Sequence, residues 1–280
     1  MPFPPAVPFT GLAGLRFIDR TYDRQLNVFS SSPDIQRNVD YFLENAGAVR
    51  SVDDLMGDRR LLTVVLGAFG LDEDIGKGAF IRKVLDEGTV DSRSFANRLA
   101  EPAYRNMSKV LGFGDVGGYL FQESTRQRIA DDYLARQFEL GVGEQDLDLR
   151  LAMNFRREAT RIIDEGGTDR TMWLKLLGSQ PLRTVVQSAL TLPSSFALID
   201  LDKQIEEITD RATGILDGDG PSAFANADVM DRFVDRFLLN SQLESGLVSG
   251  NTRGFTALTM LQNSGIGTGA TTGLFSSNFL

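Results

Sequence analysis

Acidic side chains are the main candidates for chemistry in this chain, because its 280 residues include no His and no Cys. A Ser-His-Asp or Cys-His triad, a disulfide and a zinc site built on His or Cys are therefore excluded. Arginine does not act as a base at neutral pH, so proton transfer would depend on Asp, Glu, Lys or Tyr.

Three groups of carboxylates have spacings that could do chemistry. Asp131–Asp132 could pair with Asp146 or Asp148 as acid and base in a glycosidase-like site, although a solvated helix face explains the same spacing. The triplet Asp72–Asp74 could bind a cation, but adjacent carboxylates are more typical of a helix start. Asp217–Asp219 lacks the later ligands of a calcium loop and is typical of a turn.

Other candidate groups favour structural roles. Arg59–Arg60 and Arg156–Arg157 could receive a carboxylate or a phosphate, but such pairs more often make surface ion pairs. Trp173 is expected in the core, and Gly265–Gly269 lacks the strand and the Lys-Ser/Thr of a nucleotide loop. We therefore predict no catalytic residue, no metal site, no cofactor and no small-molecule ligand.

The charge balance limits the classes of partner. Asp and Glu number 38 against 29 Lys and Arg, which gives a net charge of −9. This charge argues against nucleic acid and against an anionic membrane surface as partners. No apolar run approaches the roughly 20 residues that span a bilayer, so no membrane insertion is expected. Prolines interrupt the first residues, which lack the pattern of a signal peptide, so we expect a cytoplasmic protein or export by another route.

Apolar residues recur at helical spacing along most of the chain. Pro33 suits a first helical turn behind Ser32, and Ser51 with Asp54 resembles a capping box. The apolar stripe within 61–69 closes at Gly70, as expected for a helix C-terminus. Period-2 alternation is hard to find, so the predicted fold is an all-α multi-helix bundle with almost no β-structure.

A stretch of the first half recurs in the second. Without a gap, Met56–Leu71 (MGDRRLLTVVLGAFGL) matches Leu177–Leu192 (LGSQPLRTVVQSALTL) in its Gly, its Thr-Val-Val and its apolar face. Convergence of two amphipathic helices is the alternative, but Thr-Val-Val is poor helix-forming chemistry to arise twice. We predict an internal duplication that gives two superposable lobes, with buried valines at the matched positions Val64, Val65, Val185 and Val186.

Four segments follow from these patterns. We expect a Pro-rich segment at 1–15, a first helical lobe at 16–122, a second lobe at 123–244 and a flexible Gly/Ser/Thr-rich tail at 245–280. The tail has one charge, Arg253, and includes a short amphipathic stretch. Its apolar residues are the predicted partner-docking residues: Phe255, Leu258, Leu261, Phe275, Phe279 and Leu280.

Several specific strings resemble one family. They are Arg59–Leu71 (RRLLTVVLGAFGL), Ala79–Gly88 (AFIRKVLDEG), Phe95–Leu99 (FANRL), Leu111–Gly114 (LGFG), Phe138–Glu139 (FE), Gly143–Gln145 (GEQ), Gly178–Arg183 (GSQPLR), Leu192–Phe196 (LPSSF), Asp200–Gln204 (DLDKQ) and Phe237–Gln242 (FLLNSQ). Together they resemble a family of alphaproteobacterial proteins of unknown function that are encoded among flagellar genes. The resemblance extends from about Phe17 to Gln262.

The resemblance implies a helical bacterial protein tied to flagellar assembly or motility, and it implies no catalytic residue, cofactor or substrate. We therefore expect a non-enzymatic, flagellum-associated protein that recognises another flagellar component through a helical surface. The alternatives are an exported axial component of the flagellum and a carboxylate-based hydrolase.

Overall fold

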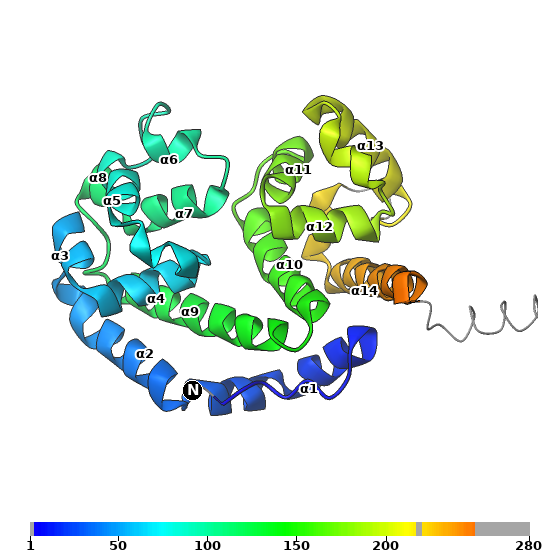
Figure 1. Cartoon of the computed structure of the whole chain (residues 1–280). Helices are drawn as coiled ribbons and strands as arrows, with labels where there is room; N and C mark the ends of the chain where they lie inside the picture. The colour runs from blue at the N-terminus through cyan, green and yellow to red at the C-terminus, as the bar shows by residue number, and fades with distance from the viewer. Residues whose placement is uncertain (1–2, 217–219, 250–280) are drawn as a thin grey trace, which may run out of the picture.

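Helices make up the regular structure of this chain, and the all-α prediction is confirmed (Figure 1). The computed structural model describes residues 3–216 and 220–249. Within those residues there is no β-strand. No helix in this part of the chain is long and apolar enough to cross a bilayer.

Two lobes of helices stand side by side and join at their base (Figure 1). A long helix, α1 (Gly11–Ser30), precedes them. The first lobe contains α2 (Pro33–Asn45), η1 (Ala46–Ala48), α3 (Val52–Gly57), α4 (Arg59–Phe69), η2 (Asp72–Gly76), α5 (Gly78–Glu87), α6 (Phe95–Arg98), α7 (Pro102–Leu111), α8 (Phe113–Val116) and α9 (Glu123–Gly143). The second lobe contains α10 (Leu147–Asp164), α11 (Asp169–Gly178), α12 (Gln180–Ala189), η3 (Ser194–Leu198), α13 (Leu201–Thr213), η4 (Pro221–Ala225) and α14 (Ala227–Ser249).

The helices α9 and α10 form a V at the base of the molecule (Figure 1). A short turn separates them, and the Asp146 side chain starts α10 by accepting from the backbone N–H groups of Asp148 and Leu149. α9 packs against α4 and α2, whereas α10 packs against α12 and α14. The predicted division after residue 122 differs from this arrangement, because it separates α9 from the helices that it covers.

The matched stretches have the same local structure. α3 ends at Gly57 and α11 ends at Gly178, and one extended residue, Asp58 or Ser179, follows each. The next helix then begins at once in both lobes. These breaks occupy matched positions in the two stretches, so the similarity extends from residue type to backbone conformation.

The packing around the two stretches also corresponds. α4 lies against α2 and α9, and those two helices contact each other. In the same way α12 lies against α10 and α14, which also contact each other. Val64, Val65, Val185 and Val186 are all fully buried, as predicted. Their common origin by duplication stays a prediction.

The helix α1 contacts both lobes, since it packs on α9 and α2 of the first and on α10 and α14 of the second. Phe29 meets Phe138 of α9 edge to face at 5.7 Å. At the other end, Arg16 Nη2 lies 2.5 Å from Asp235 Oδ2 of α14. α1 therefore joins the two lobes on the outside of the V.

Some predicted boundaries change. The Pro-rich segment ends earlier than residue 15, because α1 begins at Gly11, and the described residues before it are not helical. Pro33 does begin α2, but Ser32 does not cap it, since its hydroxyl accepts from the Phe3 N–H at 2.8 Å. The capping box of Ser51 and Asp54 is confirmed.

The predicted tail also begins later than expected. α14 continues to Ser249, so residues 245–249 belong to a helix. The predicted docking residues Phe255, Leu258, Leu261, Phe275, Phe279 and Leu280 lie outside the described residues, and so does Gly265–Gly269.

Candidate functional site: a charged cluster between the two lobes

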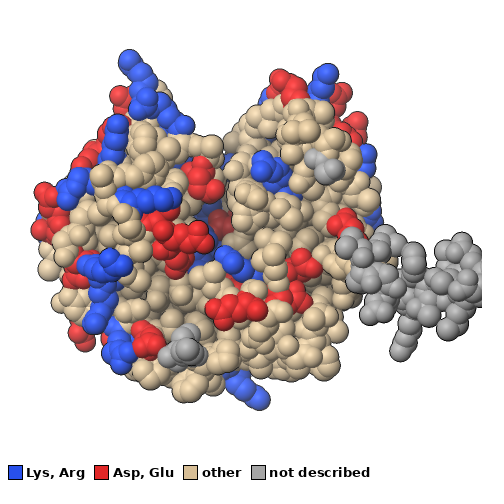
Figure 2. Space-filling view, in the orientation of Figure 1, with Lys and Arg blue, Asp and Glu red and all other residues tan. Residues whose placement is uncertain are grey.

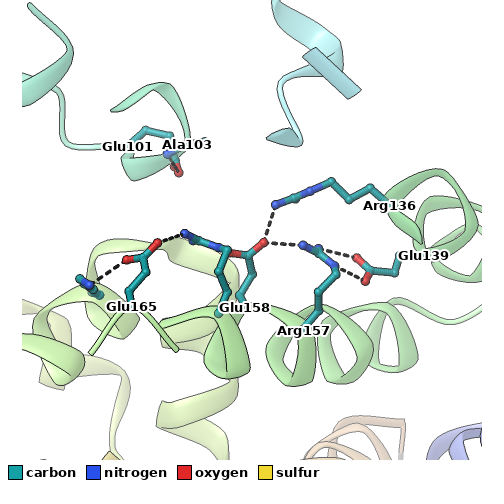
Figure 3. Close-up of polar contacts among 9 residues, drawn as sticks. Glu101, Ala103, Arg136, Glu139, Arg157, Glu158 and Glu165 are labelled. Carbon is teal, nitrogen blue, oxygen red and sulfur yellow. Dashed lines mark hydrogen bonds and ion pairs between the residues drawn. The ribbon is translucent and has the colours of Figure 1, made fainter. Parts of the chain in front are cut away.

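A groove separates the two lobes, and charged side chains of both signs lie in it (Figure 2). Its floor is the inside of the V. We call six residues of this floor the inter-lobe cluster: Asp132, Arg136 and Glu139 on α9, and Arg157, Glu158 and Arg161 on α10. Glu101, just before α7, lies across from Arg136 and Glu158 (Figure 3).

Helix geometry places these side chains together. On α9 the three residues are four and three positions apart, so they share one face. On α10, Arg157, Glu158 and Arg161 likewise fall within one turn and face α9. The divergence of the two helices leaves a gap that only long side chains can bridge, which explains why arginine and glutamate occupy it.

A continuous set of ion pairs crosses the V (Figure 3). Arg157 donates two hydrogen bonds to the Glu139 carboxylate, of 2.8 and 2.9 Å. Arg157 Nη1 also lies 2.5 Å from Glu158 Oε1, and Arg136 donates to the same oxygen. Arg161 holds the other oxygen, Glu158 Oε2, at 2.7 Å. Two nearly buried carboxylates are therefore paired with three guanidinium groups.

The arginines determine the protonation of Glu158. Burial alone would raise its pKa, but the charges of Arg136, Arg157 and Arg161 lower it to about 2. Burial lowers the pKa of Arg136, and the neighbouring Arg157 lowers it further. Glu158 is therefore ionised at neutral pH and fully occupied by cations, so it is not available as a general base.

Asp132 of the cluster and Glu101 across from it have fewer partners than Glu139 and Glu158. Burial raises the pKa of Asp132 against the opposing charges of Arg157 and Arg136, and burial raises that of Glu101. Asp132 makes no hydrogen bond or ion pair with any residue that the structure describes, and Glu101 accepts only a long 3.4 Å bond from the Ala103 N–H. The buried Nε of Arg136 has no hydrogen-bond partner in this part of the chain either. The groove thus keeps free acceptors beside a saturated ion-pair network.

This arrangement is suited to recognition. The saturated pairs fix the angle between α9 and α10, whereas Asp132 and Glu101 remain able to accept hydrogen bonds from a group that enters the groove. A cationic donor that enters the groove would form a charge-assisted bond with these oxygens, which is stronger than a neutral one. The groove can therefore bind a polar or basic segment.

The predicted carboxylate pair does not assemble. Asp146 starts α10 and accepts from Gly11, while Asp148 accepts from Ser241 of α14. Asp131–Asp132 lie far back along α9, and at 1.5 Å per residue the separation from Asp146 is about 20 Å. Glycosidase carboxylates lie roughly 5–10 Å apart. Of these residues only Asp132 lies in the groove.

The acidic triplet has structural partners. Asp72 accepts from Gln137 of α9 at 2.6 Å, and Asp74 accepts from Tyr104 and pairs with Lys77. No three His, Cys, Asp or Glu residues gather as a metal site in the described part of the chain. Asp217–Asp219 lies outside that part.

The basic pairs make ion pairs and ring contacts. Arg156 lies 2.8 Å from Asp19 and 2.7 Å from Asp231, and Arg157 belongs to the inter-lobe cluster. Arg60 lies over the Tyr41 ring. Trp173 is buried in the core, as predicted.

A second hollow lies on the surface of the second lobe. It has a volume of about 360 Å³ and lies between α10, η4 and α14, with Phe224 and Met230 at its apolar side. Its charged rim residues Arg156 and Asp231 are paired with each other. The side chain of Asp164, which also lines this hollow, makes no hydrogen bond or ion pair with the described residues, so the hollow keeps one free carboxylate.

Sequence reasoning missed the inter-lobe cluster. Asp132 and Arg157 were singled out, but each within an adjacent pair and not with its partners across two helices. The available signal was the charge pattern on facing sides of two consecutive helices, which also occurs on ordinary solvated helices.

A protein-family model matches more than half of this chain. The model for a protein of unknown function (DUF1217) matches residues 68–240, which is more than half of the chain. This chain belongs to that family. The DUF1217 match runs from the end of α4 into α14 and includes every residue of the inter-lobe cluster.

A solved structure shares this fold. The chain is similar to the crystal structure of protein AGR_C_984 from Agrobacterium tumefaciens, with 27% sequence identity and a TM-score of 0.71. The similarity covers 87% of this chain and 99% of that one. No curated protein matches the chain significantly. The two-lobed arrangement therefore extends to a second protein.

Proposed function

We propose that this DUF1217 protein is a non-enzymatic, flagellum-associated protein that acts in flagellar assembly or motility by binding another flagellar component. The resemblance of its sequence strings to proteins of flagellar gene clusters supports the setting. The groove supports the mode of action, because its walls are helices, the Asp132 side chain makes no hydrogen bond with the described residues, and Glu101 accepts only a long one from Ala103.

The observation that carries the proposal is the contrast within the groove. A catalytic acid or base needs a free group of suitable pKa near a second reacting group. Here Glu158 is held by three arginines, and Asp146 and Asp148, the suggested partners of Asp132, bond instead to Gly11 and Ser241 at the start of α10. What remains free is a pair of hydrogen-bond acceptors between two helical walls, which suits a partner segment.

Neighbouring aspartates on α9 provide a matched test. Asp132 lies in the groove, whereas Asp131 is exposed and bonds only Gln127 of its own helix at 2.9 Å. We expect Asp132→Lys to reduce capture of flagellar proteins from a motile strain at least tenfold, because it places a cation beside Arg136 and Arg157. Asp131→Lys adds the same charge outside the groove and should leave capture within about twofold.

Swimming assays and cell fractionation complete the test. Loss of swimming in a deletion strain, rescued by Asp131→Lys and not by Asp132→Lys, would support the proposal. A deletion strain that swims normally, with no flagellar protein captured, would contradict it. Stoichiometric recovery of the chain in purified flagella would instead favour the exported axial component.

A further inference from the structure

The second lobe leaves an apolar edge uncovered where η3 leads into α13. Leu198 is 86% exposed, Leu201 is 47% exposed and Ile199 is 38% exposed. Each large aliphatic side chain gains roughly 1.5–3 kcal/mol when it is fully buried. We call these three residues the η3–α13 edge.

The corresponding place in the first lobe is covered. η2 leads there into α5, and the ring of Phe80 in the first turn of α5 packs edge to face against Phe95 at 5.2 Å and Tyr104 at 5.0 Å. Phe95 and Tyr104 belong to α6 and α7, which both pack on α5. The first lobe thus covers this edge with two aromatic-bearing helices.

The second lobe has no such cover among the described residues. Between α13 and α14 the structure describes one short helix, η4, and this helix packs against α10, α11 and α14. The two lobes have matching central helices, but the first carries α6 and α7 over this edge, and the second leaves the edge open among the described residues.

We propose that the chain's own C-terminal segment, residues 250–280, covers the η3–α13 edge. Asn240 of α14 donates to the Ser188 carbonyl at 2.6 Å, and the Thr191 carbonyl accepts from Arg211 of α13 at 3.0 Å. α14, the end of α12 and α13 therefore adjoin one another. Ser249 ends α14 nine residues beyond Asn240, and Leu201 begins α13 ten residues before Arg211, so at 1.5 Å per residue each lies about 15 Å from this junction. Each extended residue adds about 3.3–3.6 Å, so about ten residues after Ser249 suffice to return to the edge.

The composition of the segment fits this place. Phe255, Leu258 and Leu261 recur at helical spacing, as do the apolar residues Phe95 and Leu99 in the first lobe's cover. The segment carries a single charge, Arg253, so covering the edge with it takes no other charged side chain of the segment out of water. Tethering gives the segment an effective concentration in the millimolar range, which favours it over an untethered competitor of similar affinity.

The lack of cysteine gives a direct test on the full chain. The variant Leu201→Cys/Leu258→Cys carries the only two thiols and is treated with a short bismaleimide at low protein concentration. The matched control is Val90→Cys/Leu258→Cys, because Val90 is 83% exposed and lies in the first lobe. We expect the intramolecular cross-link to form at least tenfold faster with position 201 than with position 90.

A second variant tests whether the apolar residues of the segment cover the edge. Phe255→Ser/Leu258→Ser should increase amide hydrogen exchange at residues 198–204 and leave residues 90–96 unchanged. Equal cross-linking rates at both positions, or no cross-link at position 201, would overturn the proposal. Cross-links between two chains would overturn it too, because a second copy would then be the occupant.

Discussion

Glu158 shows how one buried side chain links two lobes. Its carboxylate accepts from Arg136 of the first lobe and from Arg157 and Arg161 of the second. Replacing a buried ion pair by apolar residues is often neutral, whereas removing one partner leaves the others buried and unpaired. The contribution of Glu158 to the free energy of unfolding should therefore be largest when Glu158 alone is replaced and the three arginines remain.

We expect Glu158→Gln to lower the free energy of unfolding by about 3–5 kcal/mol at neutral pH. Glu165→Gln is the control, since Glu165 pairs with Arg161 and Lys175 at a more exposed site. That change should cost about 1 kcal/mol or less. Urea titrations of the three proteins at pH 7 measure both effects. Similar losses in both variants would contradict the buried role of Glu158.

The stability difference between the wild type and Glu158→Gln should also depend on pH. The pKa of Glu158 is lowered from its ordinary 4.5 to about 2 in the folded protein, so the unfolded chain takes up the proton first as the pH falls. The stabilisation is complete above about pH 5 and is lost on the way down to pH 2. The difference in unfolding free energy between wild type and Glu158→Gln should therefore shrink by about 3 kcal/mol over this range. Titrations at pH 6 and pH 3, between which about 2 kcal/mol of this change should appear, test the prediction, and a constant difference would refute it.

Gly70 has a left-handed backbone conformation that residues with a Cβ atom adopt only with strain. It ends α4 in the left-handed region at φ 73°, and an added Cβ would lie 2.7 Å from Nη1 of Arg136, which the inter-lobe cluster holds in place. Gly70→Ala should cost about 1–2 kcal/mol. At Gly178 an added Cβ meets nothing within 4 Å, so Gly178→Ala should change the thermal midpoint very little. An equal drop in both midpoints would argue against this reasoning.

The matched helices α4 and α12 differ in how they begin. Asp58 accepts from the backbone N–H groups of Arg60 and Leu61, whereas Ser179 at the matched position makes no side-chain cap. Asp58→Ala should therefore cost roughly 1 kcal/mol, within the range known for N-caps, and Ser179→Ala should cost much less. Chemical denaturation of the two variants measures this. A larger loss at Ser179 would show that the cap geometry has been misread.

At the scale of elements the sequence was informative where apolar residues repeat with a helical period. Leu61 to Phe69 and its repeat were predicted as buried helices, and Gly70 was predicted as an end. α1 was not predicted as a helix of its own, although Leu15, Ile18 and Phe29 form its buried face, because no side-chain cap marks its start and Pro33 gives a stronger start signal. Ser32 was wrongly predicted to cap α2, because its hydroxyl oxygen accepts a hydrogen bond from the distant Phe3 N–H.

The inter-lobe cluster could not be predicted in the same way. Asp132, Arg136 and Glu139 have the spacing of any charged helix face, and nothing local distinguishes a solvated face from one that faces a second helix. The distinction arises only when α10 folds back at the turn after Gly143 and brings Arg157 and Glu158 opposite. Tertiary contact, not local pattern, makes these residues a site.

At the scale of the whole molecule, α1 and the V of α9 and α10 tie the lobes together. Phe138 of α9 is fully buried and contacts Tyr22 and Phe29 of α1. We expect the wild type to unfold in one calorimetric transition, and Phe138→Ala to lower the unfolding free energy by about 3–5 kcal/mol. The loss should appear as faster hydrogen exchange in both lobes. Two separate transitions in the wild type would show that the lobes unfold independently.

The position of α1 also constrains the order of events at the ribosome. Its buried face packs partly on α14, so α1 leaves the exit tunnel well before one of the helices that cover it. At 5–20 residues per second, the intervening chain takes roughly 10–40 s to synthesise. During that time the apolar side chains of α1 lack part of their native cover. The nascent first lobe, with α2 and α9 available, can cover one end of α1, and the other end lacks its native cover until α14 has been synthesised.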